Sequence, residues 1–494
     1  MENKKSIAQN FFEVAKLYEN NIAVDDPING PISYKAFSRL VLYFANNFIG
    51  FGKNPKILIH LPQGTLAYAA MMGSIVSGAT YAPVNVSSPK ARIKMIFGQF
   101  CPDLVVSSSN FDTLVPTLIP DVTASSTDFM VSETSASSYV IFTSGSTGMP
   151  KGVEISRASH SLHVENWIKE HGIMSSDRVS QHPSVSFDLS VSDIYGALTT
   201  GATLVPFGRK LDKMFPARSI KSSKISVWNS TPSVINFMES AGELAPSSMP
   251  LLRVASFVGE PLTPRQVRVL RKAAPNVEIH NGYGPTEATV AVTHTLITNE
   301  EIICSNYTSL PLGDAMVGNR ICLVGLDGEI SETEGEIVIA GKQLAVGYWN
   351  DLEQTKKSFR TFDIGEGPER TYFTGDWARW IDKRLFFVER MDQQVKVNGH
   401  RVELEAVSEA VSDATGFAVI AIQLDQKIYA FVEGCLLTKN EVQELLEETG
   451  KILDQYAQPS GIFCIDRFPQ NENNKIDVSA LKIEALKQIE IASL

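Results

Sequence analysis

Short runs of β-branched and other apolar residues alternate with helical patterns over most of the chain, from about Ile32 to Val346. Neither a strong linker nor a repeat of fixed period interrupts this alternation. Strands that alternate with helices form an α/β core, so we expect one large α/β body here. The runs that predict strands are Lys56 to His60, Leu104 to Ser107, Tyr139 to Thr143, Ile225 to Trp228 and Val277 to His280.

The pattern changes after Asp392 to that of a small α+β unit. We predict a large domain over residues 1–391 and a small C-terminal domain over residues 392–494, because roughly 100 residues can hold a core of their own. The junction Arg390-Met391-Asp392 has no Pro/Gly-rich spacer, which favours a hinge at Asp392 over a flexible tether. The elements expected beyond it are strands at Gln394 to Val397, Phe417 to Gln423 and Ile428 to Val432, and helices at Leu404 to Ser412 and Asn440 to Thr449.

Charge and composition exclude several classes of protein. The 44 basic and 55 acidic residues give a net charge of −11 without a basic run, which argues against a nucleic-acid partner. The five cysteines lie far apart without a CxxC pair, so neither a zinc cage nor a disulfide framework is indicated, and a cytoplasmic location is expected. Prolines and glycines interrupt the longest uncharged run, Leu61 to Pro89. This run predicts a buried helix, a turn and a strand, with no membrane span.

A loop rich in hydroxyls and glycines follows the strand expected at Tyr139 to Thr143. Backbone amides and a cation in such a loop can surround phosphate oxygens. It is not a Walker A loop, because Pro150 and Gly152 stand where that loop has Gly and Ser/Thr. A flexible surface turn is the alternative. The phosphate-binding candidates in the loop are Thr143, Ser144, Gly145, Ser146, Thr147, Gly148 and Lys151.

The loop resembles the phosphate-loop signature of the adenylate-forming superfamily, which includes acyl-CoA synthetases and the adenylation domains of peptide synthetases. The resemblance implies a large N-terminal domain of β-sheets and helices with a small mobile C-terminal α+β domain. It also implies ATP and Mg²⁺ as cofactors. Further matches follow in the same order: Asn281 to Glu287, Gly335-Glu336-Ile337 with Gly347-Tyr348, Tyr372 to Asp376, Arg390 to Asp392 with Gly399 to Glu403, and Asn474 to Asp477.

Three of these residues have side chains that suit ATP chemistry. Tyr283 offers an aromatic face to adenine, and a core tyrosine is the alternative. Glu287 offers an oxygen ligand to Mg²⁺, and Asp376 can accept both ribose hydroxyls. A solvated surface glutamate and an exposed turn aspartate are the alternatives. The resemblance further implies that Arg390 lies against the ribose and that the nucleotide is lined by Asn281, Gly282, Tyr283, Gly284, Pro285 and Thr286.

Lys475 is the catalytic residue that the resemblance implies, together with Glu287. A carboxylate that attacks the α-phosphorus of ATP brings two anions together, so a cation between them stabilises the transition state. A lone lysine is otherwise a solvated surface group. Two residues depart from the superfamily pattern, which usually has Gly at the positions of Asn474 and Glu389. The first departure affects the turn before Lys475, and the second affects the hinge.

The segment from His182 to Tyr195 indicates which acid is activated. In amino-acid-activating members, an Asp at the position of Asp188 pairs with the substrate ammonium group, and a helix N-cap ahead of Leu189 is the alternative. The resemblance places uncharged residues around the substrate side chain, which favours a small or polar neutral amino acid. These residues are Leu189, Ser192, Asn229, Ser256, Val258, Gly282, Val290 and Ala291.

Within the superfamily the chain resembles the stand-alone ligases that load D-alanine onto a carrier protein, although Val258 stands where those ligases have Cys. The resemblance implies activation of the amino acid as aminoacyl-AMP and transfer to the phosphopantetheine thiol of a separate carrier protein. A ligase that joins a carboxylic acid to coenzyme A is one alternative, and it requires Asp188 to be an N-cap. A non-catalytic nucleotide-binding protein is the other, motivated by Glu389 and Asn474.

Overall fold

The computed structural model describes residues 5–111, 113–127, 136–145, 149–299, 308–365, 367–392, 394–469 and 476–492. Contacts divide the chain into two compact units. The first contains Met1–Val86, Phe100–Ile141 and Gly152–Met391. The second contains Ser87–Gln99 and Phe142–Lys151 as well as Asp392–Leu494. The domain ranges 1–391 and 392–494, and a hinge at Asp392, stay predictions.

A nine-stranded sheet dominates the first unit, in the order β15-β14-β13-β12-β11-β9-β10-β1-β2. The strands from β13 to β1 in this order pair in parallel, and antiparallel strands complete both edges. The strands are β1 (Ile22–Asp26), β2 (Gly30–Ser33), β9 (Arg178–Gln181), β10 (Thr203–Pro206), β11 (Val227–Ser230), β12 (Val254–Phe257), β13 (Glu278–Tyr283), β14 (Thr293–Leu296) and β15 (Asp314–Ala315).

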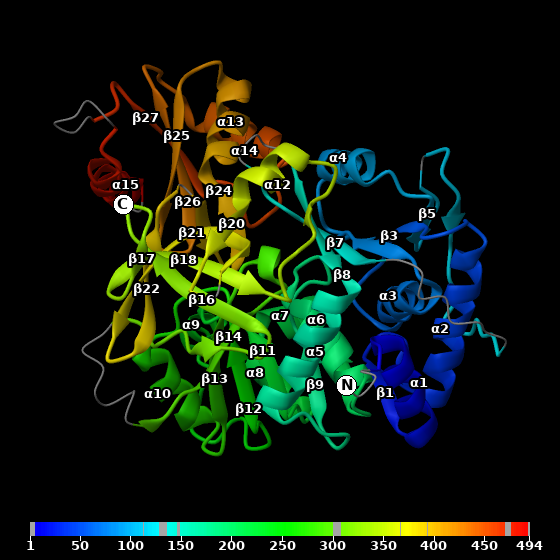
Figure 1. The fold of residues 1–494 in the computed structure, drawn as a ribbon. Helices are drawn as coiled ribbons and strands as arrows, with labels where there is room; N and C mark the ends of the chain where they lie inside the picture. The colour runs from blue at the N-terminus through cyan, green and yellow to red at the C-terminus, as the bar shows by residue number, and fades with distance from the viewer. Residues whose placement is uncertain are drawn as a thin grey trace. The chain divides into compact units, whose positions relative to one another are not determined.

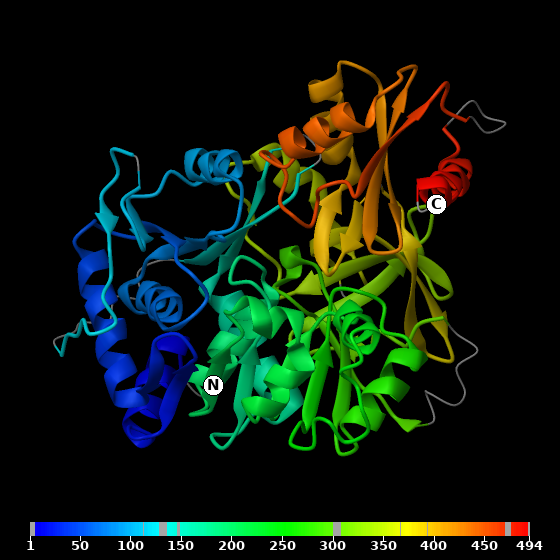
Figure 2. The same cartoon turned by 180° about the vertical axis from the view of Figure 1, so that it is seen from behind.

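Successive side chains of these strands point to opposite faces of the sheet, and both faces are apolar. Helices therefore cover both faces. Val227 and Val254 share a core with α5 (Arg157–His171) and α6 (Leu189–Leu198). Trp228 and Ala255, one residue further along, share another core with helices of the opposite face. Figure 1 shows α5 and α6 on one side of the strands, and Figure 2 shows the other side. The opposite helices are α8 (Pro216–Ser222), α9 (Ser233–Ser240) and α10 (Pro264–Ala273), and α7 (Lys210–Met214) precedes them.

A second, seven-stranded sheet has the order β19-β8-β7-β4-β3-β5-β6. The strands expected at Lys56 to His60 and Leu104 to Ser107 are β3 and β5, with the same bounds. The uncharged run from Leu61 to Pro89 contains a buried helix and a buried strand, as predicted. The other elements are β4 (Thr80–Pro83), β6 (Thr117–Leu118), β7 (Ser137–Thr143), β8 (Lys151–Ser156), β19 (Gly347–Tyr348), α1 (Ile7–Leu17), α2 (Tyr34–Ile49), α3 (Thr65–Ser77) and α4 (Lys90–Phe100).

An antiparallel sheet follows in the chain, where the alternation of strands and helices was expected to continue to Val346. Tight turns, and not helices, join its first strands, because Gly325 to Glu329 and Ser331 to Glu334 form short hydrogen-bonded turns. The sheet has the order β17-β16-β18-β21-β20, and β22 pairs with β21. Its elements are β16 (Asn319–Val324), β17 (Ile330–Ser331), β18 (Glu334–Gly341), β20 (Phe359–Asp363), β21 (Pro368–Ile381), β22 (Arg384–Arg390) and the short helix α12 (Leu352–Ser358).

The second unit has an α+β composition, with cores of its own around Val407, Phe431 and Ala430. The strands and helices expected after Asp392 are present within a few residues of their predicted bounds. Among the described residues, every helix of the chain is too short or too polar to cross a bilayer. The elements are β23 (Gln394–Val397), β24 (His400–Glu403), β25 (Val419–Leu424), β26 (Lys427–Glu433), β27 (Gly461–Ile465), α13 (Leu404–Thr415), α14 (Lys439–Thr449) and α15 (Val478–Ala492).

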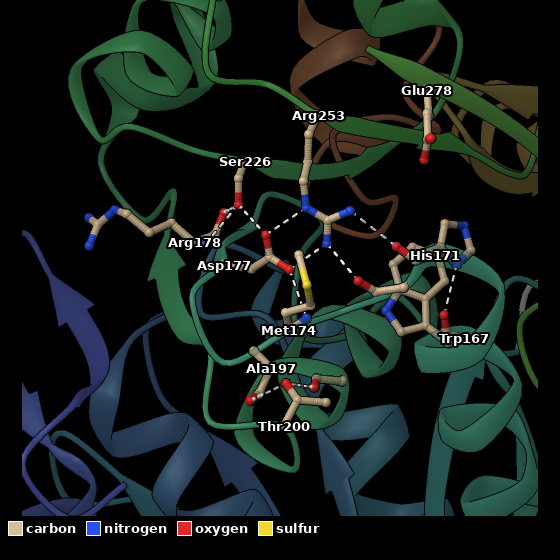
Figure 3. Close-up of polar contacts among 12 residues, drawn as sticks. Trp167, His171, Met174, Asp177, Arg178, Ala197, Thr200, Ser226, Arg253 and Glu278 are labelled. Atoms are coloured by element: carbon tan, nitrogen blue, oxygen red, sulfur yellow. Dashed lines mark hydrogen bonds and ion pairs between the residues drawn. The ribbon is translucent and has the colours of Figure 1, made fainter. Parts of the chain in front are cut away.

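An ion pair fixes the C-terminal end of α5 to the parallel sheet (Figure 3). The Arg253 Nε donates to Asp177 Oδ1 at 2.8 Å, and the same guanidinium donates to the carbonyl of Gly172 at 2.8 Å. The Asp177 carboxylate also accepts from the Met174 amide and the Ser226 hydroxyl, each at 2.8 Å. Burial alone raises the pKa of Asp177, but these donors lower it more, so its pKa lies below the usual value.

Replacing Asp177 by alanine is expected to destabilise the first unit by about 3 kcal/mol, because it leaves the partly buried Arg253 guanidinium without its carboxylate. The melting temperature should fall by several degrees in a thermal denaturation followed by circular dichroism. Asp413→Ala, the same change at an exposed position of α13, is the matched control. Equal melting temperatures for the two variants would show that the ion pair does not stabilise this end of α5.

Candidate active site

A cavity lies between the parallel sheet and α5 and α6, near the carboxyl ends of β11 to β13. Asn229, Ser256 and His280 are cross-strand neighbours in these strands. Ser256 lies two residues after Val254, so its side chain points to the same face, toward α5 and α6. Ligands of open α/β sheets bind at this edge of the strands. The cavity is lined by His163, Trp167, His171, Leu189, Ser192, Ser256, Val258, Gly282, Val290, Ala291, Thr293, His294 and Met316.

Most of the residues expected around the substrate side chain meet at this cavity. Seven of the eight, all except Asn229, are among its lining residues. Asn229 is buried beside it, and its Nδ2 donates to the Leu189 carbonyl at 3.4 Å. The cavity is small, with a volume of about 10 Å³.

The wall formed by Val290 and Ala291 is held in a strained turn. Thr289 and Val290 have φ values of 57° and 72°, a left-handed conformation that is unusual for β-branched residues. The fully buried Gln343 stabilises this turn: its Nε2 donates to the Ala291 carbonyl at 2.8 Å, and its own carbonyl accepts from Thr289 Oγ1 at 2.5 Å. Sequence reasoning missed Gln343, because it lies more than fifty positions from the turn that it supports.

Asp188 is 5% exposed and directly precedes Leu189 of the cavity wall. It occupies the N-cap position of α6, but its side chain makes no capping hydrogen bond to the described residues of the helix. Its carboxylate lies close enough to Tyr139 to add to the effect of burial, which raises the pKa of that tyrosine well above its usual value. The N-cap interpretation therefore lacks the hydrogen bond that defines it.

Two of the nucleotide candidates, Tyr283 and Asp376, are joined by hydrogen bonding. The Tyr283 hydroxyl donates to Asp376 Oδ2 at 2.6 Å, and Arg390 Nη1 lies 2.6 Å from Asp376 Oδ1. Asp376 in β21 and Arg390 in β22 are cross-strand partners, which places them side by side. Asp376 is 6% exposed, so it is not an exposed turn residue. Burial, and then the Asp376 charge, raise the pKa of Tyr283 well above its usual value.

Glu287 lies in a short 3₁₀ turn (Thr286–Ala288) and is fully buried, unlike a solvated surface glutamate. Its Oε1 accepts from the Tyr348 hydroxyl at 2.8 Å. A buried carboxylate offers the hard oxygen that Mg²⁺ prefers, and Mg²⁺ in nucleotide sites commonly uses one or two carboxylates together with phosphates. The donor chemistry of Glu287 therefore fits the metal that the resemblance implies.

The glycines around Tyr283 allow two chain segments to approach each other. A Cβ on Gly284 would lie 2.6 Å from the Ala291 Cα, and one on Gly282 would lie 2.9 Å from the Thr293 carbonyl oxygen. Gly282 lines the cavity, and both glycines allow this close packing. Asn281 is buried, and its Nδ2 donates to the Pro311 carbonyl at 2.7 Å.

The phosphate-loop candidates belong to the second unit where the structure describes them. The Thr143 hydroxyl donates to the Lys151 carbonyl at 3.3 Å, and the Ser144 hydroxyl donates to the Arg401 carbonyl at 2.7 Å. Ser146, Thr147 and Gly148 lie outside the described residues, as do Asn474 and Lys475. Their assigned roles stay predictions that rest on the resemblance.

Sequence reasoning missed the helical wall of the cavity. His163, Trp167 and His171 follow one another at intervals of four residues on α5, which places them on one face. This spacing was the available signal, but a buried helix face has the same pattern. His163 Nε2 lies 2.8 Å from the Ser192 hydroxyl, and His171 Nε2 lies 3.0 Å from the Ser256 hydroxyl.

Buried histidines make the stability of the protein sensitive to acid. Burial lowers the pKa of His163 and of His182 to about 4, from the usual 6.5, and lowers the pKa of His160 as well. Below pH 6.5 these histidines bind protons in the unfolded chain but stay neutral in the folded protein. Their contribution to the free energy of unfolding is therefore fully present above pH 6.5 and is lost as the pH falls toward 4. At pH 5, His163 and His182 together should lower the free energy of unfolding by about 4 kcal/mol. Asp193, whose pKa burial raises, acts in the opposite direction.

We therefore expect the melting temperature to be several degrees lower at pH 5 than at pH 7, measured by circular dichroism at constant ionic strength. An unchanged or higher value at pH 5 would contradict the neutral state of these histidines.

Comparison with known proteins shows the family and the fold of the chain. The family of AMP-binding enzymes matches residues 11–349. A D-alanine--D-alanyl carrier protein ligase of Listeria monocytogenes serotype 4b is 33% identical over 493 residues, which cover 92% of this chain and 94% of the relative. The ligase of that name from Lactiplantibacillus plantarum is 29% identical, covering 97% and 98%. AlmE, an adenylation domain of Vibrio cholerae solved with glycyl-adenosine-5'-phosphate, has the same fold, with a TM-score of 0.84, 24% identity and 99% coverage of both chains.

The chain belongs to the AMP-binding enzyme family. It is an ATP-dependent ligase of the adenylate-forming class, and the predictions of this superfamily and of its α/β fold are confirmed.

Proposed function

We propose that this enzyme activates a small neutral amino acid with ATP and transfers the aminoacyl group to the phosphopantetheine thiol of a separate carrier protein. The observation that supports this most directly is the small cavity, lined by seven of the expected residues, beside the buried carboxylate of Asp188. The Listeria relative named above is a D-alanine--D-alanyl carrier protein ligase. D-alanine is therefore the first candidate substrate.

The size and charge of the cavity support a side chain no larger than a few atoms. The space is narrow, and the described lining residues are apolar, hydroxyl-bearing or histidine, without an acidic or lysine side chain. A cationic or anionic side chain would lose its hydration there without gaining a partner of opposite charge. A methyl group or a hydrogen atom needs little space and no polar partner.

The reaction has two steps. The amino acid carboxylate attacks the α-phosphorus of ATP, which forms aminoacyl-AMP and releases pyrophosphate; the carrier thiol then attacks the acyl carbonyl, and AMP leaves. Asp188 binds the substrate ammonium group, and Asp376 with Tyr283 binds the nucleoside. Lys475 stabilises the charge that develops as the two anions meet. Glu287 would hold Mg²⁺, which neutralises phosphate charge when bound.

Asp376 can keep its present partners in this role. Its two oxygens accept from Tyr283 and Arg390. Ribose hydroxyls can add to these contacts, because each carboxylate oxygen has a second lone pair. Tyr283 is partly exposed, and an aromatic ring can stack on adenine.

The test is amino-acid-dependent exchange of labelled pyrophosphate into ATP, with D-alanine, glycine and the common L-amino acids. We expect D-alanine to give the strongest exchange, with glycine next, because both fit the cavity. The second step is tested by mass spectrometry of a phosphopantetheinylated carrier protein after incubation with the enzyme, ATP and the best substrate. The carrier without its phosphopantetheine arm is the control.

The two alternative functions predict different results in these assays. Exchange that depends on a simple carboxylic acid, with product formed on coenzyme A, would favour the acyl-CoA ligase. Tight ATP binding without exchange for any acid would contradict catalysis and favour a nucleotide-binding protein.

A further inference from the structure

Three histidines from three elements meet at the inner side of the cavity. His171 ends α5, His280 lies in β13 and His294 lies in β14. One ring nitrogen of each lies within 4.8 Å of those of the other two. The closest pair, His280 Nδ1 and His294 Nε2, is 2.7 Å apart. The ring centroids lie 4.7 to 5.2 Å from one another.

The outer nitrogens of two of these rings already have the partners that metal-binding histidines need. His171 Nδ1 donates to the Trp167 carbonyl at 2.9 Å, so Nε2 carries the lone pair and accepts from the Ser256 hydroxyl at 3.0 Å. His294 Nδ1 lies 3.3 Å from a carboxylate oxygen of Glu170. Such contacts fix the tautomer and the ring orientation of a ligand, and they recur around metal sites.

The cluster is not fully satisfied by protein groups. His280 Nε2 is buried and has no hydrogen-bond partner among the described residues, and its closest acidic atom, Glu278 Oε2, is 3.9 Å away. A buried polar nitrogen without a partner destabilises the folded state. If His280 Nδ1 ligated a cation, the single proton of the neutral His280 ring would lie on Nε2, the nitrogen nearer to the Glu278 carboxylate. The cation would replace the 2.7 Å hydrogen bond between His280 Nδ1 and His294 Nε2.

We propose that His171, His280 and His294 form a site for one divalent transition-metal ion of the zinc class, with the Ser256 hydroxyl or a water as fourth ligand. Three neutral imidazoles with one further oxygen are a common set for Zn²⁺. Tetrahedral Zn–N bonds place the nitrogens roughly 3.3 Å apart, so His280 and His294 need to separate by roughly 0.6 Å. This site stands independently of the proposed amino-acid substrate.

The site has a route to solvent and a position next to the substrate. The His294 and Glu170 side chains are 14% and 27% exposed, which leaves one side open to an entering ion. His171, His294 and Ser256 also line the cavity. A bound dication would place positive charge on that wall.

The test is direct binding of Co²⁺ and Zn²⁺ to the chelator-treated, full-length protein. The thiols of Cys435 and Cys464 lie 3.3 Å apart in the second unit and offer a competing site, so the measurements use a Cys435→Ser background. Co²⁺ should give the visible absorption of a tetrahedral ion without a thiolate band, at one ion per chain, and Zn²⁺ should displace it. Calorimetry gives the affinity.

His280→Gln and His294→Gln should each weaken Zn²⁺ binding by more than 100-fold, and Glu170→Gln by about 10- to 100-fold. His60→Gln removes a half-buried histidine outside the cluster and should bind as the background protein does. Circular dichroism checks that each variant is folded. If the histidine variants unfold, the affinity of Glu170→Gln for Zn²⁺ tests the proposal, because this variant keeps all three rings. No stoichiometric ion in the background protein, or unchanged affinity in Glu170→Gln, would overturn the proposal. The readout needs neither ATP nor an amino acid, so it fails or succeeds separately from the proposed function.

Discussion

Replacing Asp188 by asparagine is expected to lower kcat/KM for the amino acid by roughly 10²- to 10³-fold in the pyrophosphate exchange assay. The carboxylate is 5% exposed, and the proposed function assigns it a substrate ammonium group to bind. Removing one partner of a buried ion pair costs about 3–5 kcal/mol. ATP affinity, measured by calorimetry, should stay within a few-fold of the unaltered enzyme.

The control is Asp413→Asn, the same change at an exposed residue of α13, which should leave both values unchanged. If Asp188→Asn kept full exchange with the amino acid, the carboxylate would not bind the ammonium group. Activity with simple carboxylic acids, unaffected by the substitution, would instead favour the acyl-CoA ligase.

Replacing Asp376 by alanine is expected to weaken ATP binding by about 100-fold or more and to lower the melting temperature. Two effects combine: the ribose loses its acceptor, and Arg390 and the Tyr283 hydroxyl both lose the carboxylate that they contact at 2.6 Å. The Arg390 side chain is 13% exposed, so its charge would be left largely without solvent. Calorimetric titration with ATP and thermal denaturation measure the two effects separately.

Asp376→Asn separates the ribose contact from the fold. The amide keeps an acceptor for one neighbour, so the loss of stability should be smaller than in the alanine variant, while ATP binding should still fall. An alanine variant that binds ATP normally would show that Asp376 is a structural residue of β21 and β22 only.

Local signals predicted the strands of the parallel sheets and those after Asp392 well, and the antiparallel sheet from β16 to β22 poorly. The strands at Lys56 to His60 and Leu104 to Ser107 were predicted with their observed bounds, because both are short apolar runs bounded by polar or turn residues. The sheet from β16 to β22 was not distinguished, because strands joined by tight turns can be followed only through their long-range pairing. The ion pair of Asp177 with Arg253 joins residues 76 positions apart, which no local pattern could indicate.

The cavity was predicted in part for a similar reason. The resemblance gave positions such as Gly282 and Val290, since these lie in or just after the motif from Asn281 to Glu287. His163, Trp167 and His171 belong to no motif, and their spacing fits an ordinary buried helix face equally well. The burial of Asp188 and Glu287 also needed the structure, because a sequence gives no direct measure of how much of a carboxylate is exposed.

One strand of the sheet separates the two substrates of the proposed reaction. Along β13, Gly282 lines the cavity, whereas the adjacent Tyr283 makes its contact with Asp376. Successive residues of a strand point to opposite faces. Substitutions that reshape the acid pocket therefore fall on alternate positions from those that contact the nucleotide. In a family of enzymes with this arrangement, point mutations in the substrate pocket can change which acid is bound while the residues that contact ATP stay the same.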